Sequence, residues 1–328
     1  MAKATLGRPG KRKAATSGVP AMSALRFFQD DISKTLFPLK TNLFLVENGE
    51  AEIKECISKC LDEGEKAYSF LPQQRVYAAK THHHLRRAVK LDVISEYYLC
   101  DTICRNRNAF RKPHSHSREH YGYRFEGGRP ISPTIAYRAF KGAISEYSKT
   151  YKFFISIDVA SYFNGVYHHD LVNWFRELPA VSDEDVNGLG QMLREINSGR
   201  SVDCLPQGLY PAKMIGNDFL RFVENYHGLK SDRVIRFMDD IYLFANDEQV
   251  ITDDFILIQT LLGDKGLSVN PRKTNRASAE HVKLEREIEK VREDLLQRRR
   301  VIISNDYADD GEVESVFRKS PLNDSELD

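Results

Sequence analysis

The chain has 328 residues, of which 48 are Lys or Arg and 47 are Asp or Glu, so its formal net charge is +1. With 41% hydrophobic residues it is long enough for one large domain or two lobes, which excludes disorder of the whole chain. The charge is unevenly distributed: residues 1–150 carry 26 basic and 15 acidic side chains, whereas residues 151–328 carry 22 and 32. A net charge near zero therefore does not exclude a nucleic-acid partner.

The sequence also disfavours a membrane-spanning or a secreted protein. No apolar run approaches the roughly 18–20 residues needed to span a bilayer, and the N-terminus lacks the apolar stretch of a secretory signal. We therefore expect a cytoplasmic protein with no membrane contact. The five cysteines are an odd number in a long chain, which indicates reduced thiols rather than a disulfide framework.

The two ends are the most polar parts of the chain. Residues 1–20 are basic and interrupted by Gly and Pro, and we expect a disordered basic arm. Residues 306–328 carry 8 acidic and 2 basic side chains, which predicts an acidic disordered tail. Between them, residues 21–69 are expected to form an N-terminal helical extension, because Ile53, Ile57 and Leu61 recur at helical spacing.

A basic, aromatic-rich segment follows. Residues 71–150 carry 15 Lys or Arg against 6 acids, interleaved with aromatic side chains, a composition suited to a polyanion whose bases can stack. The segment also has the spacing of a possible zinc site, which would be formed by Cys100, Cys104, His114, His116 and His120. Histidines lining a polar surface that faces nucleic acid are the alternative.

After residue 150 the pattern changes to strands and helices. The apolar run 151–158 predicts a strand, and 234–245 predicts a hairpin with Asp239 and Asp240 at its tip. Helices are expected over 171–178, 212–223 and 253–262. This order predicts an α+β fold with an antiparallel sheet and helices packed on one face.

Three carboxylates stand beside these apolar strands: Asp158, Asp239 and Asp240. Carboxylates next to apolar runs are costly to desolvate unless a cation offsets the cost, and Mg²⁺ prefers oxygen ligands. Because side chains alternate along a strand, we expect Asp239 to align with Asp158 and Asp240 to be secondary. Ordinary turn chemistry also explains an Asp pair at a hairpin tip, so the further motifs matter.

Four segments in order resemble motifs of the reverse transcriptases. They are FISIDVASYFNGVYHHDL (154–171), LPQGLYPAKMIGNDFL (205–220), RFMDDIYLF (236–244) and GLSVNPRKT (266–274). GGRPIS (127–132) is similar to a fingers motif of the same family, and VYHHDL (166–171) is most similar to bacterial abortive-infection, defence-associated and unclassified-group members. The resemblance implies a right-hand polymerase with fingers at 70–150, a palm at 151–278 and a short helical thumb at 279–305.

The resemblance also implies roles for individual residues. It assigns catalysis to Asp158, Asp239, Asp240 and Lys273, and two Mg²⁺ ions, with Mn²⁺ as an alternative, to Asp158, Val159, Asp239 and Asp240. It assigns nucleotide binding to Phe163, Gln207, Gly208, Arg129 and Lys141, and nucleic-acid binding to Arg124, Arg138 and Met238. Phe163 matches a steric gate, whose ring would collide with a ribose 2′-hydroxyl.

Two departures from the family pattern concern primer contacts and template handling. Phe237 stands where Tyr is common in the Asp-Asp hairpin, so a hydroxyl is lost. The sequence Leu209–Tyr210–Pro211 replaces the usual small, Ser-containing continuation after Gly208.

The implied function is RNA-directed DNA synthesis from an RNA template, a DNA or RNA primer and dNTPs, in bacterial antiviral (antiphage) defence. Two alternatives remain open: primer- or template-independent DNA synthesis by the same site, and a catalytically silent RNA-binding scaffold subunit. An apolar stripe on the charged C-terminal helix predicts a homo-oligomer or a partner subunit; it comprises Leu284, Ile288, Val291 and Leu295.

Overall fold

The computed structural model describes residues 22–35, 37–62, 68–79, 85–110, 115, 117–199, 205–206, 208–276, 287–288 and 290–291. The predicted basic arm and acidic tail lie outside these residues, as do His114, His116, Gln207 and most of the predicted thumb. Within the described chain, no helix is both long enough and apolar enough to cross a membrane.

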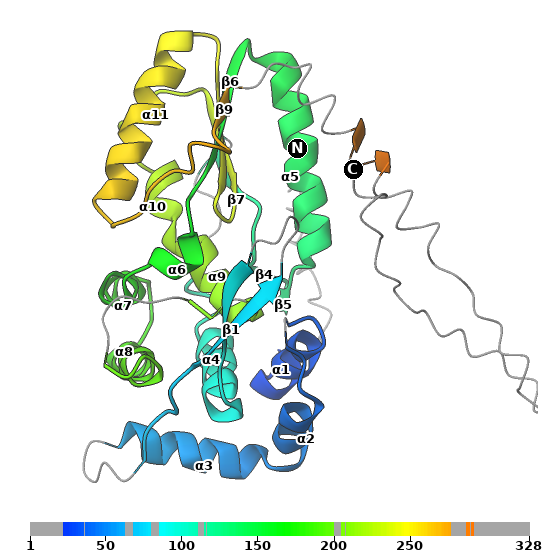
Figure 1. The fold of residues 1–328 in the computed structure, drawn as a ribbon, viewed down its shortest axis with the longest axis vertical. Coiled ribbons are helices and arrows are strands. Elements are labelled where there is room, and N and C mark those ends of the chain that lie inside the picture. Colours follow the sequence, from blue (N-terminus) through cyan, green and yellow to red (C-terminus); the bar gives the residue numbers. More distant parts are fainter. Residues whose placement is uncertain are drawn as a thin grey trace, which may run out of the picture.

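The N-terminal region is helical and forms one end of the molecule (Figure 1). It comprises α1 (Ala24–Ile32), α2 (Lys40–Asn48) and α3 (Glu50–Leu61), which pack with α4 (Val93–Arg105). Side chains set two of the helix starts: Ser23 accepts the Arg26 N–H of α1, and Asp92 accepts two N–H groups of α4. The apolar faces of these helices share one buried core.

Two short hairpins form separate two-stranded sheets outside the main sheet. β1 (Gln74–Ala79) pairs with β2 (Leu85–Lys90), and β4 (Phe125–Glu126) pairs with β5 (Arg129–Pro130). The second hairpin turns at Gly127 and Gly128, whose φ angles are +55° and +79°. Glycine adopts this left-handed backbone without strain, which explains the Gly pair in the GGRPIS segment.

The main sheet has five strands in the order β3-β7-β8-β6-β9. These are β3 (Arg118–His120), β7 (Arg233–Phe237), β8 (Asp240–Ala245), β6 (Phe153–Asp158) and β9 (Asn275–Arg276). The predicted strand before Asp158 and the predicted hairpin are both confirmed. The sheet is not wholly antiparallel, however, because β3 pairs with β7 in parallel.

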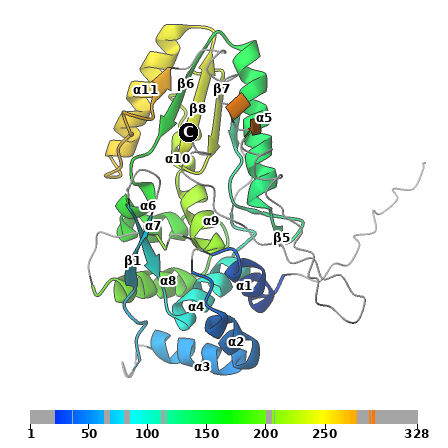
Figure 2. The ribbon, with the colours of Figure 1, turned by 45° about the vertical axis from the view of Figure 1, so that its right-hand side comes forward.

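Helices cover both faces of this sheet, so the prediction of helices on one face is wrong. α11 (Glu248–Gly263) lies on one face and α5 (Pro133–Thr150) on the other (Figures 1 and 2). Ile157 and Ile241 share a buried cluster with Ile258 of α11, whereas Phe154 and Phe244 share a second cluster with α5. Strands buried on both faces have continuous apolar runs, and the 151–158 run carried this signal.

The remaining helices connect the sheet to the N-terminal end. They are α6 (Tyr162–Gly165), α7 (His168–Arg176), α8 (Asp183–Ile196), α9 (Tyr210–Phe219) and α10 (Arg221–Glu224). The helix expected over 212–223 forms in two pieces, α9 and α10, and α8 was not predicted. α8 packs against α7 and α4, which joins the helical layer at the lower end of the molecule (Figure 2).

A buried carboxyl ties the N-terminal region to α9. Asp31 of α1 accepts the backbone N–H of Tyr210 at 2.8 Å, and the Tyr210 hydroxyl lies 3.0 Å from the Arg124 carbonyl and 2.9 Å from that of Ile131. Burial raises the pKa of Asp31 to about 6, because this effect exceeds the opposing effect of the Tyr210 hydrogen bond.

This pKa predicts how Asp31→Asn changes the pH dependence of stability. The folded-state pKa lies above the ordinary value of 3.8, so the contribution of Asp31 is fully present below about pH 4 and is lost as the pH rises to about 6. We expect Asp31→Asn to raise the thermal unfolding midpoint relative to wild type above about pH 7, and to lose this advantage near pH 4. Asp30→Asn, at the less buried neighbour, serves as the control; an equal effect of Asp31→Asn at both pH values would contradict the assignment.

Candidate active site

A cavity of 810 Å³ lies at the end of β6, beside the β7–β8 turn. It brings together residues from the four segments that resemble reverse-transcriptase palm motifs, and six predicted site residues line it: Asp158, Val159, Phe163, Gly208, Asp239 and Lys273. Three cations that sequence reasoning missed also line the cavity: Lys34, Arg87 and Lys213. Lys34 follows α1, Arg87 lies in β2 and Lys213 lies in α9. Only the folded chain brings these three cations to the carboxylates.

The strand register places the carboxylates. Asp158 of β6 is the register partner of Asp240 of β8, and the Val159 N–H donates to the Asp239 carbonyl at 3.2 Å. Asp239 lines the cavity with Asp158, whereas Asp240 is not among the described lining residues. The cavity therefore groups Asp158 with Asp239, which lies in the β7–β8 turn, whereas the register sets Asp158 opposite Asp240.

The carboxylates lie in an unfavourable electrostatic environment. Burial raises the pKa of Asp239, and the neighbouring Asp158 raises it further. Burial also raises the pKa of Asp240 to about 7, with Asp239 and Asp158 adding to the effect. Positive charge at this position would relieve the mutual repulsion, which is the condition under which a cation is held.

Lys273 supplies part of this positive charge. Its Nζ lies 2.9 Å from Asp158 Oδ1, and the hydrogen bond raises the pKa of Lys273. Asn270 Nδ2 donates to the other carboxylate oxygen at 3.1 Å, and the Asn270 N–H donates to the Asp158 carbonyl at 2.7 Å. The GLSVNPRKT segment therefore closes over Asp158, and Asn270 is a contact that sequence reasoning missed.

The donor atoms fit a hard divalent cation. Asp158 and Asp239 provide carboxylate oxygens, and oxygen ligands are what Mg²⁺ and Mn²⁺ prefer. Among the residues that the structure describes, no group of three or more His, Cys, Asp or Glu side chains is arranged to hold a metal ion. Mg²⁺ is commonly bound by only one or two carboxylates together with waters and substrate phosphates, so the pair in the cavity suffices.

Of the residues in the possible zinc site, the structure describes Cys100, Cys104 and His120, and none of them lines the cavity with the carboxylates. Cys100 and Cys104 are buried in the helical core, and Cys104 Sγ donates to the Met22 carbonyl at 3.1 Å. His120 is buried elsewhere, with Nδ1 3.7 Å from a Glu224 oxygen, and burial lowers its pKa well below the usual range.

The fingers cations chosen from the sequence do not line the cavity among its described residues. Arg129 lines a second cavity of 510 Å³, which shares Lys34 and Lys213 with the first. Arg124 binds Glu126 at 2.6 Å and the His120 carbonyl at 3.1 Å.

The other two cations, Lys141 and Arg138, lie on α5. Lys141 Nζ lies 5.5 Å from the centre of the Tyr137 ring, and its charge lowers the pKa of Asp240. Arg138 is exposed on the same helix.

Two further residues with roles predicted from the sequence, Phe163 and Met238, differ in where their side chains lie. Phe163 forms part of the cavity wall, its carbonyl accepts the Leu205 N–H at 2.9 Å, and its ring packs against Tyr162. Met238, predicted to contact nucleic acid, is only 6% exposed and has a left-handed φ of +56°. Its side chain is therefore packed in the protein, and its backbone carries the unusual geometry.

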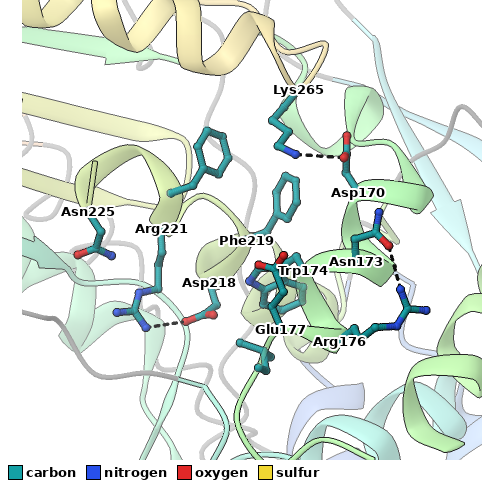
Figure 3. Close-up of a pocket in the computed structure, with 12 residues that line it drawn as sticks. Asp170, Asn173, Trp174, Arg176, Glu177, Asp218, Phe219, Arg221, Asn225 and Lys265 are labelled. Atoms are coloured by element: carbon teal, nitrogen blue, oxygen red, sulfur yellow. Dashed lines mark hydrogen bonds and ion pairs between the residues drawn. The ribbon is translucent and has the colours of Figure 1, made fainter. Parts of the chain in front are cut away.

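Another cavity, of 610 Å³, contains none of the predicted site residues. It lies between α7, α9 and α10, with aromatic side chains and the ion pairs Lys265–Asp170 (3.1 Å) and Arg221–Asp218 (3.4 Å) (Figure 3). Asp158 and Asp239 line the 810 Å³ cavity and not this one, so we place the candidate site there.

An apolar-flanked carboxylate strand beside a carboxylate hairpin is the arrangement of a palm-like polymerase fold. A family model described as reverse transcriptase (RNA-dependent DNA polymerase) matches residues 97–290. The match covers more than half of the chain, which therefore belongs to this family of nucleotidyltransferases. No curated protein matches the chain.

Gly122 lies close to Asn217, whose side chain supports the β7–β8 turn, so a methyl group at position 122 should destabilise the protein. A Cβ at Gly122 would lie 2.1 Å from Asn217 Oδ1, the atom that accepts the Met238 N–H at 3.3 Å. We expect Gly122→Ala to lower the free energy of unfolding by about 1–3 kcal/mol. Gly142→Ala is the matched control, because a Cβ there meets nothing within 4 Å and helix propensity favours Ala by about 0.5–1 kcal/mol. Chemical denaturation measures both; equal stabilities would contradict the close contact.

Proposed function

We propose that this protein extends a primer with deoxynucleotides on an RNA template, with Asp158 and Asp239 as the metal-binding pair and Asp240 assisting. The observation that carries the proposal is the 810 Å³ cavity, in which these two carboxylates meet the Phe163 side chain and several cations. The family match supports the same activity.

The residues of the cavity have separate tasks in this mechanism. Two Mg²⁺ ions, when bound, would activate the primer 3′-hydroxyl and stabilise charge on the leaving pyrophosphate. Asp158 and Asp239 would hold them through carboxylate oxygens, with the Val159 carbonyl as a further oxygen donor. Lys273 balances the charge of Asp158 and would supply positive charge or a proton to the pyrophosphate.

For the cation that would bind the triphosphate, the structure favours other residues than the Arg129 and Lys141 expected from the sequence. Arg87 and Lys213 line the cavity with the carboxylates, and Arg87 Nε donates to Asn164 Oδ1 at 3.3 Å. Arginine donates in a planar fork that matches phosphate oxygens, so Arg87 is the stronger candidate. Gly208 also lines the cavity, where the lack of a side chain permits close approach of the backbone.

Phe163 gives the proposal its substrate class. Its ring is part of the cavity wall, and α9 lies directly behind it: a Cβ at Gly216 would be 3.4 Å from Phe163 Cζ. A ring that cannot retreat would collide with a ribose 2′-hydroxyl, which favours dNTPs over NTPs.

The division into lobes stays a proposal: fingers at 70–150, palm at 151–278 and thumb at 279–305. β3 is a strand of the palm sheet and α5 packs on that sheet, although both belong to the segment assigned to the fingers. Ile288 and Val291 of the C-terminal stripe are 60% and 58% exposed, which supports a partner subunit or a second copy at that helix.

The antiphage setting is a narrower proposal. It rests on the resemblance of residues 166–171 to defence-associated members, and α7 begins within this segment, at His168. Primer- or template-independent synthesis uses the same carboxylates and is distinguished by omitting primer or template. A silent RNA-binding scaffold is distinguished by the absence of any synthesis.

The central test is nucleotide incorporation by the full chain. Purified protein with Mg²⁺, an RNA template and an annealed primer should incorporate labelled dNTPs in preference to NTPs, and omission of primer or template should abolish synthesis. Asp239→Asn should lower incorporation by at least about 10³-fold, because it removes a charged metal ligand. Asp232→Asn, at an exposed aspartate near the same hairpin, is the control. Incorporation that survives Asp239→Asn would refute the assignment.

The choice of triphosphate ligand is tested by comparing arginines. We expect Arg87→Ala to raise the KM for dNTPs on the order of tenfold, as the loss of a charged hydrogen bond to phosphate predicts. Arg75→Ala, at an exposed position on the partner strand of the same hairpin, should leave KM within about twofold. If Arg129→Ala raises KM and Arg87→Ala does not, the assignment from the sequence is the better one.

A further inference from the structure

A buried ion pair lies beneath the candidate catalytic hairpin and has no part in the mechanism above. Arg236 of β7 is 0% exposed and Glu224 of α10 is 1% exposed. Arg236 Nε donates to Glu224 Oε2 at 2.8 Å, and its Nη2 donates to Oε1 at 2.8 Å. This two-point contact fixes the plane of the guanidinium group.

The other donors of Arg236 are directed at the turn that carries Asp239. Nη1 donates to the Met238 carbonyl at 2.9 Å and to Asn217 Oδ1 at 3.2 Å, and Nη2 donates to the Asn217 carbonyl at 2.7 Å. Asn217 Oδ1 also accepts the Met238 N–H at 3.3 Å. Both backbone polar groups of Met238 are therefore held by this cluster.

Met238 needs such support because its φ angle is +56°. Left-handed backbone is unfavourable for a residue with a side chain and persists where the surroundings hold it in place. Asp239 is the next residue, and its carbonyl accepts the Val159 N–H at 3.2 Å. A relaxed turn at Met238 would therefore move Asp239 relative to Asp158.

We propose that Arg236, oriented by Glu224, is a positioning residue that holds the Met238 turn in its left-handed form and so sets the place of Asp239 beside Asp158. The catalytic part of this proposal rests on the proposed function. Stability alone does not account for the pair, because apolar side chains of similar volume often stabilise a fold as well as a buried ion pair does. The contact with the Met238 carbonyl is what an apolar pair cannot supply.

The test replaces the ion pair without leaving one charge buried alone. Arg236→Met combined with Glu224→Leu should stay folded, with a lower unfolding midpoint because the Met238 and Asn217 carbonyls lose their donor. It should lower kcat for dNTP incorporation by about 10²-fold and change KM by less than about threefold. The matched control is Arg221→Met with Asp218→Leu, which removes the neighbouring buried pair at 3.4 Å (Figure 3) and should retain kcat. A folded Arg236–Glu224 double variant with wild-type kcat would overturn the proposal.

A second variant and a second readout make the test independent of folding and of catalysis. Asn217→Ala keeps the ion pair but removes the oxygen that Arg236 and Met238 share, and it should lower kcat about tenfold. Hydrogen–deuterium exchange of residues 233–245 should become faster in both Arg236–Glu224 and Asn217 variants and stay unchanged in the Arg221–Asp218 control. If wild type incorporates no nucleotide, the proposed function fails while the exchange comparison still decides the positioning role; unchanged exchange would refute it.

Discussion

The pairing of β6 with β8 determines where the candidate catalytic carboxylates lie. Its register sets Asp158 opposite Asp240 and brings the Val159 N–H to the Asp239 carbonyl. A shift by one residue would turn every side chain of a strand to the opposite face. Such a shift is opposed on both faces, because Phe154 and Phe244 stack at 5.5 Å on the α5 side while Ile157 and Ile241 are buried on the other. Two separate cores thus fix one register.

The uneven charge of the chain has a counterpart in the cavity. The carboxylates come from the acidic second half, whereas Lys34 and Arg87 come from the basic first half. Lys34 follows α1, the helix whose Asp31 binds the first N–H of α9. The segment that follows α1 therefore forms part of the cavity wall, although the family match begins only at residue 97.

Sequence reasoning succeeded where one segment carries the whole signal. The strand ending in Asp158 and the hairpin at Asp239 are local patterns of apolar runs and turns, and both were predicted within a few residues. The parallel β3, the second helical layer and the cations of the cavity depend on pairings between distant segments. Arg87 lies in a short basic stretch with no motif, and Arg236 reads as an ordinary polar residue in a strand. Only the fold shows that the first lines the cavity and the second is buried.

Tyr210 shows what a bulky residue does at a position where the family pattern has a small one. Its ring packs against Phe27 of α1 and against Tyr123, with ring centres 5.7 Å and 4.9 Å away, and its hydroxyl reaches the carbonyls flanking the β4–β5 hairpin. One side chain on α9 thus contacts both α1 and the residues flanking this hairpin. The β1–β2 hairpin, which brings Arg87 to the cavity, takes no part in these Tyr210 contacts, so the bulky residue at position 210 stabilises the opposite support of the site and leaves the arginine side unaltered.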